Sequence, residues 1–264
     1  MYRFLLSPGW LARLAVALLL AAVMSLLGMW QWQRFEERSA INERIDAAEV
    51  ADPVPLTSLV TAPGPGEPVG AGLPADTDWS KVTVTGQYDP EHEFLVRGRS
   101  MSGRVGVEVL TPLRLADGSA VLVNRGWIVA PGGAAELPDP PAAPAGQVTV
   151  VGWARPSERG GTVVEHAGEL TIRRIDLPAM AAQLPYPVYG VYVQLAEQQP
   201  EADPALTLLP TRRENAWLNA AYTVQWAIFA GMTLVGFGWL ARRHAREALH
   251  QPRADGEQAL LSRS

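Results

Sequence analysis

The side chains that most often carry out catalysis are scarce in this sequence. It contains no cysteine, which excludes disulfides, thiolate nucleophiles, iron–sulfur clusters and thiolate zinc sites. Its four histidines lack metal-ligand spacing: His92 and His166 fall in predicted loops, and His244 and His250 in a C-terminal tail. It has no G-x-S-x-G elbow, phosphate-binding glycine loop or HExxH helix. We therefore expect that the protein holds no metal ion and is not an enzyme. One alternative, a membrane-bound hydrolase, would need a nucleophile and a base that these residues do not supply.

Two short groups of aromatic and polar side chains are better candidates for binding. Asn219, Tyr222 and Trp226 share one helical face through their i, i+3, i+7 spacing. The second group consists of Trp30, Gln31 and Arg34. If this group meets the first, the two form an aromatic, hydrogen-bonding cleft that holds one cation. The alternative is an interfacial belt, in which Trp and Tyr anchor a helix at the membrane surface.

Two apolar segments have the length needed to hold these groups in a membrane. From Leu14 to Trp30 no residue carries a formal charge, and extension to Trp32 gives roughly the 20 residues that cross a bilayer. No run of small residues marks a cleavage site after this core, so we predict an uncleaved anchor. The second segment, Trp217 to Ala241, contains no ionisable Asp, Glu, Lys, Arg or His. The alternative for the second segment is a buried core helix.

The residues that flank and fill these segments predict their orientation and their packing. Arginines precede the first segment and follow the second, which favours cytoplasmic termini in a bacterial inner membrane. Small residues at helical spacing predict that the two spans pack together. The arginines are Arg3, Arg13, Arg242, Arg243 and Arg246; the small residues are Ala17, Ala21, Ser25 and Gly28, then Ala220, Ala227, Gly231 and Gly238.

The predicted organisation places a large domain between the spans. Residues 33–241 hold 15 Lys plus Arg and 24 Asp plus Glu, so this portion is acidic and nucleic acid is not an expected partner. The multi-pass chain would contact the lipid bilayer through its spans. Its parts are a cytoplasmic N-terminus (1–13), a first span (14–32), an extracytoplasmic β-rich domain (33–216), a second span (217–241) and a cytoplasmic tail (242–264).

Alternating residues predict that the central domain is a β-structure. The charged segment that follows the first span extends its helix, and residues 61–78, rich in Gly and Pro, form a loop. Asp117-Gly118 between two apolar runs predicts a hairpin. A loop is expected at 131–146 and a short helix near 178–184. Seven short strands are predicted, at 82–88, 94–99, 105–113, 120–129, 147–153, 169–175 and 188–195, which favour a mainly antiparallel barrel or sandwich-like fold.

Three arginines on the predicted strands form a second candidate surface. Arg97, Arg99 and Arg125 lie on predicted strands that we expect to be adjacent, and they could make one cationic patch that faces the membrane or a partner protein. The alternative is that they pair with acidic side chains on the strand faces. The neighbours Asn124, Gly126 and Trp127 are better explained as fold determinants, because glycine in a strand marks a bulge or a close approach of backbones.

Four sequence blocks between Leu27 and Trp239 resemble those of the Surfeit locus protein 1 family. In order they are LGMWQWQR at the end of the first span, VTVTGQYDPEHEFLVRGR, GVEVLTPLRLADGSAVLVNRGWI, and AAYTVQW at the opening of the second span. Each block is short, but the four stand in the family's order between two spans.

This resemblance implies an assembly factor for haem–copper cytochrome c oxidase. Such a factor helps haem a to reach, or to remain stable in, subunit I, and haem A synthase is a further implied partner. Trp30, Tyr222 and Trp226 could then hold a porphyrin edge while Arg34 pairs with a propionate. Asn219 stands where some relatives have a histidine, and an amide is a poor axial ligand for haem iron. The alternative function is a membrane-tethered ligand-binding or scaffold domain unrelated to the oxidase.

Overall fold

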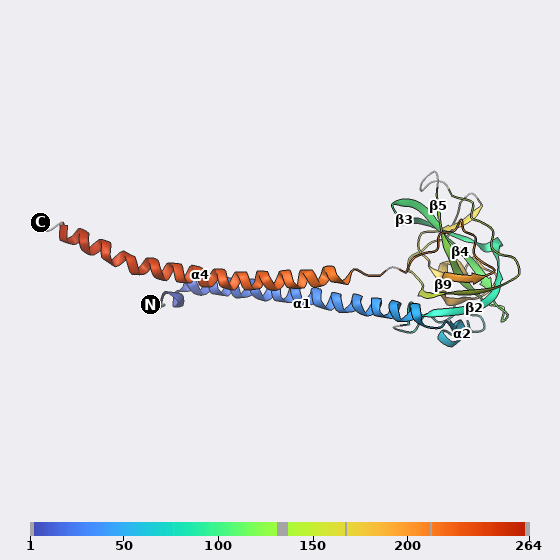
Figure 1. Ribbon diagram of the computed structural model, residues 1–264, viewed down its shortest axis with the longest axis horizontal. Coiled ribbons are helices and arrows are strands. Elements are labelled where there is room, and N and C mark those ends of the chain that lie inside the picture. Colours follow the sequence, from blue (N-terminus) through green and yellow to red (C-terminus); the bar gives the residue numbers. More distant parts are fainter. Residues whose placement is uncertain (1–2, 76, 131–136, 167, 212, 262–264) are drawn as a thin grey trace. The chain divides into compact units, whose positions relative to one another are not determined.

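A computed structural model describes residues 3–75, 77–130, 137–166, 168–211 and 213–261 of the chain (Figure 1). The described residues divide into two compact units. One contains the two long helices and comprises residues 1–43 and 213–264, and the other is a β-rich domain at 44–212. The predicted loop at 131–146 is therefore described only from residue 137 onward.

Two long helices make up most of the first unit. α1 runs from Pro8 to Val50, after a short 3-10 turn η1 (Arg3–Leu6), and α4 runs from Ala216 to Leu261. By length and composition both could cross a membrane, since their most apolar 18-residue windows have mean hydropathies of 2.2 and 1.5. Only 11% and 6% of those windows are buried inside the structure, unlike the core helix of a soluble domain. Both helices continue beyond the predicted spans, as the sequence indicated for the first.

The two helices pack against each other in antiparallel directions (Figure 1). The Trp10 ring lies 6.0 Å from that of Phe237, and the Phe35 ring lies 5.8 Å from that of Trp217. Between Trp10 and Phe35, all the buried and half-buried residues of α1 except Leu27 recur at alternating spacings of four and three, which is the heptad pattern of paired helices. They are Trp10, Leu14, Ala17, Ala21, Met24, Gly28, Gln31 and Phe35.

The small residues predicted to line this contact do so only in part on both helices, since Ser25 of α1 is exposed while Ala220 and Gly238 of α4 are half-buried. Ala17, Ala21 and Gly28 are buried, as expected from their spacing. On α4, Gly231 has no atom within 4 Å of an added Cβ and Ala227 is exposed. Because alanine and glycine are abundant throughout the chain, their spacing alone did not identify the packed face. That face instead carries Ala216, Asn219, Thr223, Trp226, Ala230, Thr233, Phe237 and Ala241.

The second unit is built on a nine-stranded mixed sheet in the order β1-β2-β6-β9-β5-β4-β3-β8-β7. The pairs β1–β2, β3–β8 and β5–β9 are parallel and the others antiparallel, and a short β2–β4 pairing links two strands that are separated in this order. The β-rich domain is therefore confirmed, whereas its description as a barrel or sandwich stays a prediction. The strands are β1 (Val54–Pro55), β2 (Lys81–Tyr88), β3 (Phe94–Met101), β4 (Arg104–Arg114), β5 (Ala120–Val129), β6 (Gln147–Pro156), β7 (Val164–His166), β8 (Glu169–Ile172) and β9 (Val188–Gln199).

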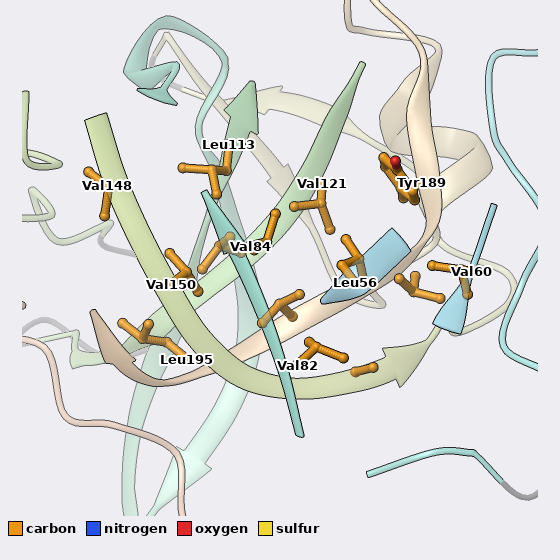
Figure 2. Close-up of a cluster of buried hydrophobic side chains, with 14 of the residues drawn as sticks. Leu56, Val60, Val82, Val84, Leu113, Val121, Val148, Val150, Tyr189 and Leu195 are labelled. Atoms are coloured by element: carbon orange, nitrogen blue, oxygen red, sulfur yellow. The ribbon is translucent and has the colours of Figure 1, made fainter. Parts of the chain in front are cut away.

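β5 is buried on both faces because two apolar clusters lie on either side of it. Val121 and Val123 point into the cluster of Figure 2, which the short helix α2 (Leu56–Leu59) covers with Leu56. Leu122, on the opposite face, joins a second cluster that includes Met180 of α3 (Leu177–Ala181). This alternation follows the two-residue period of a strand. It explains why the run AVLVNRGWIV is almost uniformly apolar.

Local structure agrees with the sequence in the hairpin and differs from it at the edges of the sheet. Gly118 has a φ of 83° between β4 and β5, and Asp117 Oδ1 accepts a hydrogen bond from the amide of Ser119, so the predicted turn is confirmed. The loop predicted at 61–78 carries only an isolated bridge, between Val69 and Val188, among its described residues. The short elements β1, α2 and β7 were not predicted, and His166 ends β7 rather than lying in a loop.

We predict that Met24→Cys and Thr233→Cys together form a disulfide on mild oxidation of the full chain in detergent. Met24 Sδ lies 3.7 Å from Thr233 Oγ1, and the chain has no other cysteine to interfere. Mass spectrometry after alkylation would count the protected thiols. The control pair is Met24→Cys with Val235→Cys, since Val235 is 73% exposed. Equal protection of both pairs, or none of either, would contradict the packing of α1 on α4.

Candidate functional site

The helix pair brings part of the predicted aromatic and polar site together. Asn219 is 9% exposed and faces α1, and the Cβ of Trp226 lies 3.5 Å from the position that a Cβ would take at Gly28. Thr223 joins them, because its hydroxyl donates to the carbonyl oxygens of Asn219, at 3.0 Å, and Gly28, at 3.4 Å. Glycine at position 28 thus lets the two backbones approach closely.

Of the other predicted members, Trp30, Tyr222 and Arg34 point away from the contact and Gln31 does not. Trp30 is 52% exposed and Tyr222 41% exposed, while Gln31 is half-buried on the packed face of α1. Arg34 Nη1 lies 3.1 Å from Glu37 Oε2 one turn along its own helix. Such an exposed pair contributes at most about 1 kcal/mol, so the Arg34 guanidinium can exchange partners. The six residues therefore do not form one cleft: Asn219, Trp226 and Gln31 lie in the helix contact, and the other three are exposed. We call these three exposed residues, Trp30, Arg34 and Tyr222, the outer aromatic surface.

The residues of this region do not fit an axially ligated haem. Asn219 faces the neighbouring helix, its carboxamide is a poor iron ligand, and its buried Nδ2 has no hydrogen-bond partner among the described residues. Among the same residues no group of three His, Asp or Glu side chains could hold a metal ion. What the surface offers is exposed aromatic area beside one arginine.

In the β-rich domain, Arg125 is buried rather than part of a surface patch. Its side chain is 2% exposed, and Nη1 donates a hydrogen bond of 3.0 Å to Glu93 Oε2. Nη2 donates to the carbonyl oxygens of Pro141 and Ala142 at 3.0 and 3.1 Å. The guanidinium also lies 5.7 Å from the ring centroid of Tyr88. The arginine of the NRGW motif therefore fastens β5 to the end of β2, the start of β3 and the proline-rich loop.

Glu93 holds a charge in a setting that disfavours it. Burial raises the pKa of its carboxyl group, and the hydrogen bond from Thr111 and the nearby charge of Arg125 oppose that rise. Thr111 donates to the same oxygen, Oε2, that receives Arg125. The pair is thus stabilised in its ionised form by several groups at once, because a single partner would not offset the loss of hydration.

Arg99 forms a second acidic pairing on strand β3. Its Nη2 donates to both carboxylate oxygens of Glu158, at 2.8 and 3.0 Å, and its Nε lies 3.5 Å from Glu108. Burial raises the pKa of Glu108, against which Arg99 and a hydrogen bond from Asn124 act. The alternative interpretation, arginines paired with acidic residues, therefore describes Arg99 and Arg125. These two strands are also not adjacent, since β4 separates them.

The rest of the NRGW motif shapes the strand around these charges. Gly126 has a φ of 138° where the β4–β5 register shifts, and a Cβ there would lie 2.9 Å from the carbonyl oxygen of Thr207. Asn124 Oδ1 accepts from the amide of Gly126, and Trp127 Nε1 donates to the carbonyl of Arg99 at 3.1 Å. The predicted role of Asn124, Gly126 and Trp127 as fold determinants agrees with these contacts.

Sequence reasoning singled out the arginines and missed their partners. Glu93 and Glu158 lie 32 and 59 residues along the chain from the arginines that they bind, so no local spacing reveals these pairs. Glu108 lies across the β3–β4 hairpin from Arg99. The available signal was charge inside apolar strands: Glu108 interrupts VGVEVL just as Arg125 interrupts AVLVNRGW. A charge at such a position needs an opposite charge nearby.

These features define a protein with two apolar helices, one before and one after a β-rich domain that is fixed by a buried Arg125–Glu93 pair and a half-buried pairing of Arg99. A comparison with protein families matches residues 18–231 to the SURF1 family. The chain belongs to the SURF1 family, which confirms the resemblance seen in the sequence. The matched region extends from α1 through the whole β-rich domain into α4.

Curated relatives extend this similarity over nearly the whole chain. An uncharacterized SURF1-like protein of Mycobacterium tuberculosis is 31% identical over 260 residues, which cover 96% of this chain and 92% of that protein. Surfeit locus protein 1 of Takifugu rubripes is 28% identical over 42% of this chain and 48% of its own. The cytochrome oxidase assembly protein SHY1 of Saccharomyces cerevisiae is 28% identical over 39% of this chain and 24% of its own.

Arg125→Met should lower the free energy of unfolding by about 3–5 kcal/mol, because it leaves Glu93 buried without a cation. Urea titration of the full chain in detergent, followed by tryptophan fluorescence, measures this loss. The raised pKa of Glu93 means that protonation favours the folded state, so the loss should be largest above that pKa and shrink as the pH falls.

Two further variants make this result specific to the buried pair. Arg104→Met removes an exposed arginine of β4 and should change stability by less than about 0.5 kcal/mol. Combining Arg125→Met with Glu93→Leu should recover part of the loss. A double variant as unstable as the sum of its single variants would show that the pair is not coupled.

Proposed function

We propose that this protein is an assembly factor for haem–copper cytochrome c oxidase, and that it assists the insertion of haem a into subunit I or stabilises the haem there. The observation that carries the proposal is membership of the SURF1 family, one relative of which is named a cytochrome oxidase assembly protein. The assignment is to assembly rather than to catalysis. Subunit I is the proposed partner, with haem A synthase as a second.

The outer aromatic surface of the helix pair is the proposed place of contact with the haem or its carrier. Trp30 and Tyr222 expose aromatic area, and Arg34 has a weak, exposed ion pair that a propionate could replace. Asn219 takes no part as an iron ligand in this proposal, because its amide faces α1. Its place is in the packing that keeps the two helices together.

The proposed orientation puts both termini in the cytoplasm and the β-rich domain outside it. Arg13 lies before the apolar part of α1, and Arg242 and Arg243 follow that of α4, which supports this assignment. The domain would then stand on the outer side of a bacterial inner membrane. The two apolar helices and the bacterial origin of a nearly full-length relative are consistent with that membrane.

Deleting the gene from its host should lower the haem a-type oxidase measured in membrane absorption spectra, with b-type haem as the internal reference. The wild-type gene should restore it, and Arg34→Ala or Tyr222→Phe should restore it only in part. Arg104→Ala, an exposed substitution in the domain, is the matched control. Unchanged oxidase in the deletion strain would reject the proposal. Purification that recovers neither oxidase nor haem A synthase would favour the tethered ligand-binding domain.

The orientation has a separate test, because single cysteines can be placed in this cysteine-free chain. Asp117→Cys lies on the exposed turn between β4 and β5, and Glu247→Cys lies exposed on α4 beyond the apolar segment. A membrane-impermeant thiol reagent added to spheroplasts should label the first and spare the second until the membrane is broken. Labelling of Glu247→Cys alone in intact spheroplasts would reverse the proposed orientation.

A further inference from the structure

A cleft at the β7–β8 end of the sheet gathers three arginines. Its volume is about 500 Å³, and its lining includes Arg97 of β3 together with Arg173 and Arg174, which directly follow β8. The segment Gly160–Thr162 forms another wall. Arg97 was predicted to bind a partner, but in the structure it shares this cleft with Arg173 and Arg174 instead of with Arg99 and Arg125.

The chain around this cleft is fixed by internal hydrogen bonds. Arg174 Nη1 donates to the carbonyl oxygen of Arg159 at 3.0 Å, and the amide of Gly161 donates to Asp176 Oδ2 at 3.0 Å. A Cβ at Gly161 would lie 2.7 Å from the carbonyl oxygen of Arg174, so the loop approaches the arginine segment as closely as glycine allows. The amide of Glu158 donates to the carbonyl of Ile175 at 2.8 Å. The wall is thus held in place without a ligand.

The charge of this cleft contrasts with that of the domain. Among the described residues that line it, none is acidic. Two acidic side chains on the adjoining segments bind other groups: Asp176 accepts from the amides of Gly161 and Ala179, and Glu158 binds Arg99 and the amide of Ile175. Glu165 of β7 and Glu169 of β8 are exposed and do not line the cleft. A concentrated positive charge therefore lies within a portion of the chain that is acidic as a whole.

We propose that this cleft binds a phosphate group through Arg97, Arg173 and Arg174. Guanidinium groups pair with phosphate oxygens through two parallel hydrogen bonds, and several of them favour a multiply charged anion over a single carboxylate. A soluble phosphate ester or pyrophosphate presents this chemistry, and so does a phospholipid head group. The proposal is independent of the role in oxidase assembly, because binding can be measured on the purified protein alone.

The test uses the full chain in a nonionic detergent at low ionic strength, titrated with inorganic pyrophosphate in a calorimeter. Wild type should bind saturably at one site, with an affinity that falls as salt is added. Arg173→Gln combined with Arg174→Gln should weaken binding about tenfold or more. Arg97→Gln, which removes the arginine on the neighbouring strand β3, should weaken binding as well. Thermal unfolding followed by circular dichroism confirms that each variant is folded.

The matched control is Arg104→Gln combined with Arg114→Gln, which removes the same charge from exposed positions of β4 outside the cleft. This control should bind pyrophosphate as the wild type does. An equal loss in control and cleft variants would show a nonspecific effect of charge and overturn the proposal. The proposal would also be overturned if the wild-type protein bound neither pyrophosphate nor the anionic lipid dihexanoyl phosphatidylglycerol saturably.

Competition distinguishes the two sources of the phosphate. Dihexanoyl phosphatidylglycerol, a short-chain anionic lipid, is added to the complex with pyrophosphate, and dihexanoyl phosphatidylcholine serves as the zwitterionic control. Displacement by the anionic lipid alone assigns the cleft to a phospholipid head group. Pyrophosphate binding without displacement assigns it to a soluble phosphate ligand. Both outcomes support the proposal when the cleft variants lose binding.

Discussion

A guanidinium that cannot reach water constrains the β-rich domain. Arg125 lies in the strand that both apolar clusters cover, so its charge must be matched inside the domain. Glu93 supplies the opposite charge, and the carbonyls of residues 141 and 142 occupy the donors that remain. Three segments distant in sequence are therefore held at one point. Removing any of them would leave a polar group buried without its partner.

The helix pair also depends on a few specific contacts. In the proposed membrane location, lipid would offer no hydrophobic drive for two helices to associate, so close packing and polar contacts would have to hold them. Gly28 permits the close approach, and the Thr223 hydroxyl reaches a carbonyl on each helix. Beyond the apolar part, Asn42 exchanges two hydrogen bonds with the backbone of Glu214, at 2.9 and 2.8 Å. The contact is thus fixed at positions well separated along α1.

The sequence was sufficient for elements whose signal is local. Alternation located β2 and β5 to within a residue, Asp117-Gly118 located a turn, and long uncharged runs located both helices. The sequence did not predict the strand order or the parallel β5–β9 pair, because both depend on contacts between distant segments. The packed face of α4 also escaped prediction, since small residues occur on several of its faces.

The charged residues of the candidate sites show the same limit of prediction from sequence. Arg97, Arg99 and Arg125 look alike in sequence, each lying within a predicted strand, yet they take three different environments: the lining of a cleft, a half-buried carboxylate pair and a buried network. The strand period assigns a residue to one face, but it does not say whether that face meets another layer, an acidic neighbour or water. Arg173 and Arg174 were also predicted to lie in a strand, at 169–175, but β8 ends at Ile172 and they follow it. The function of an arginine in this domain is therefore set by what the fold places opposite it.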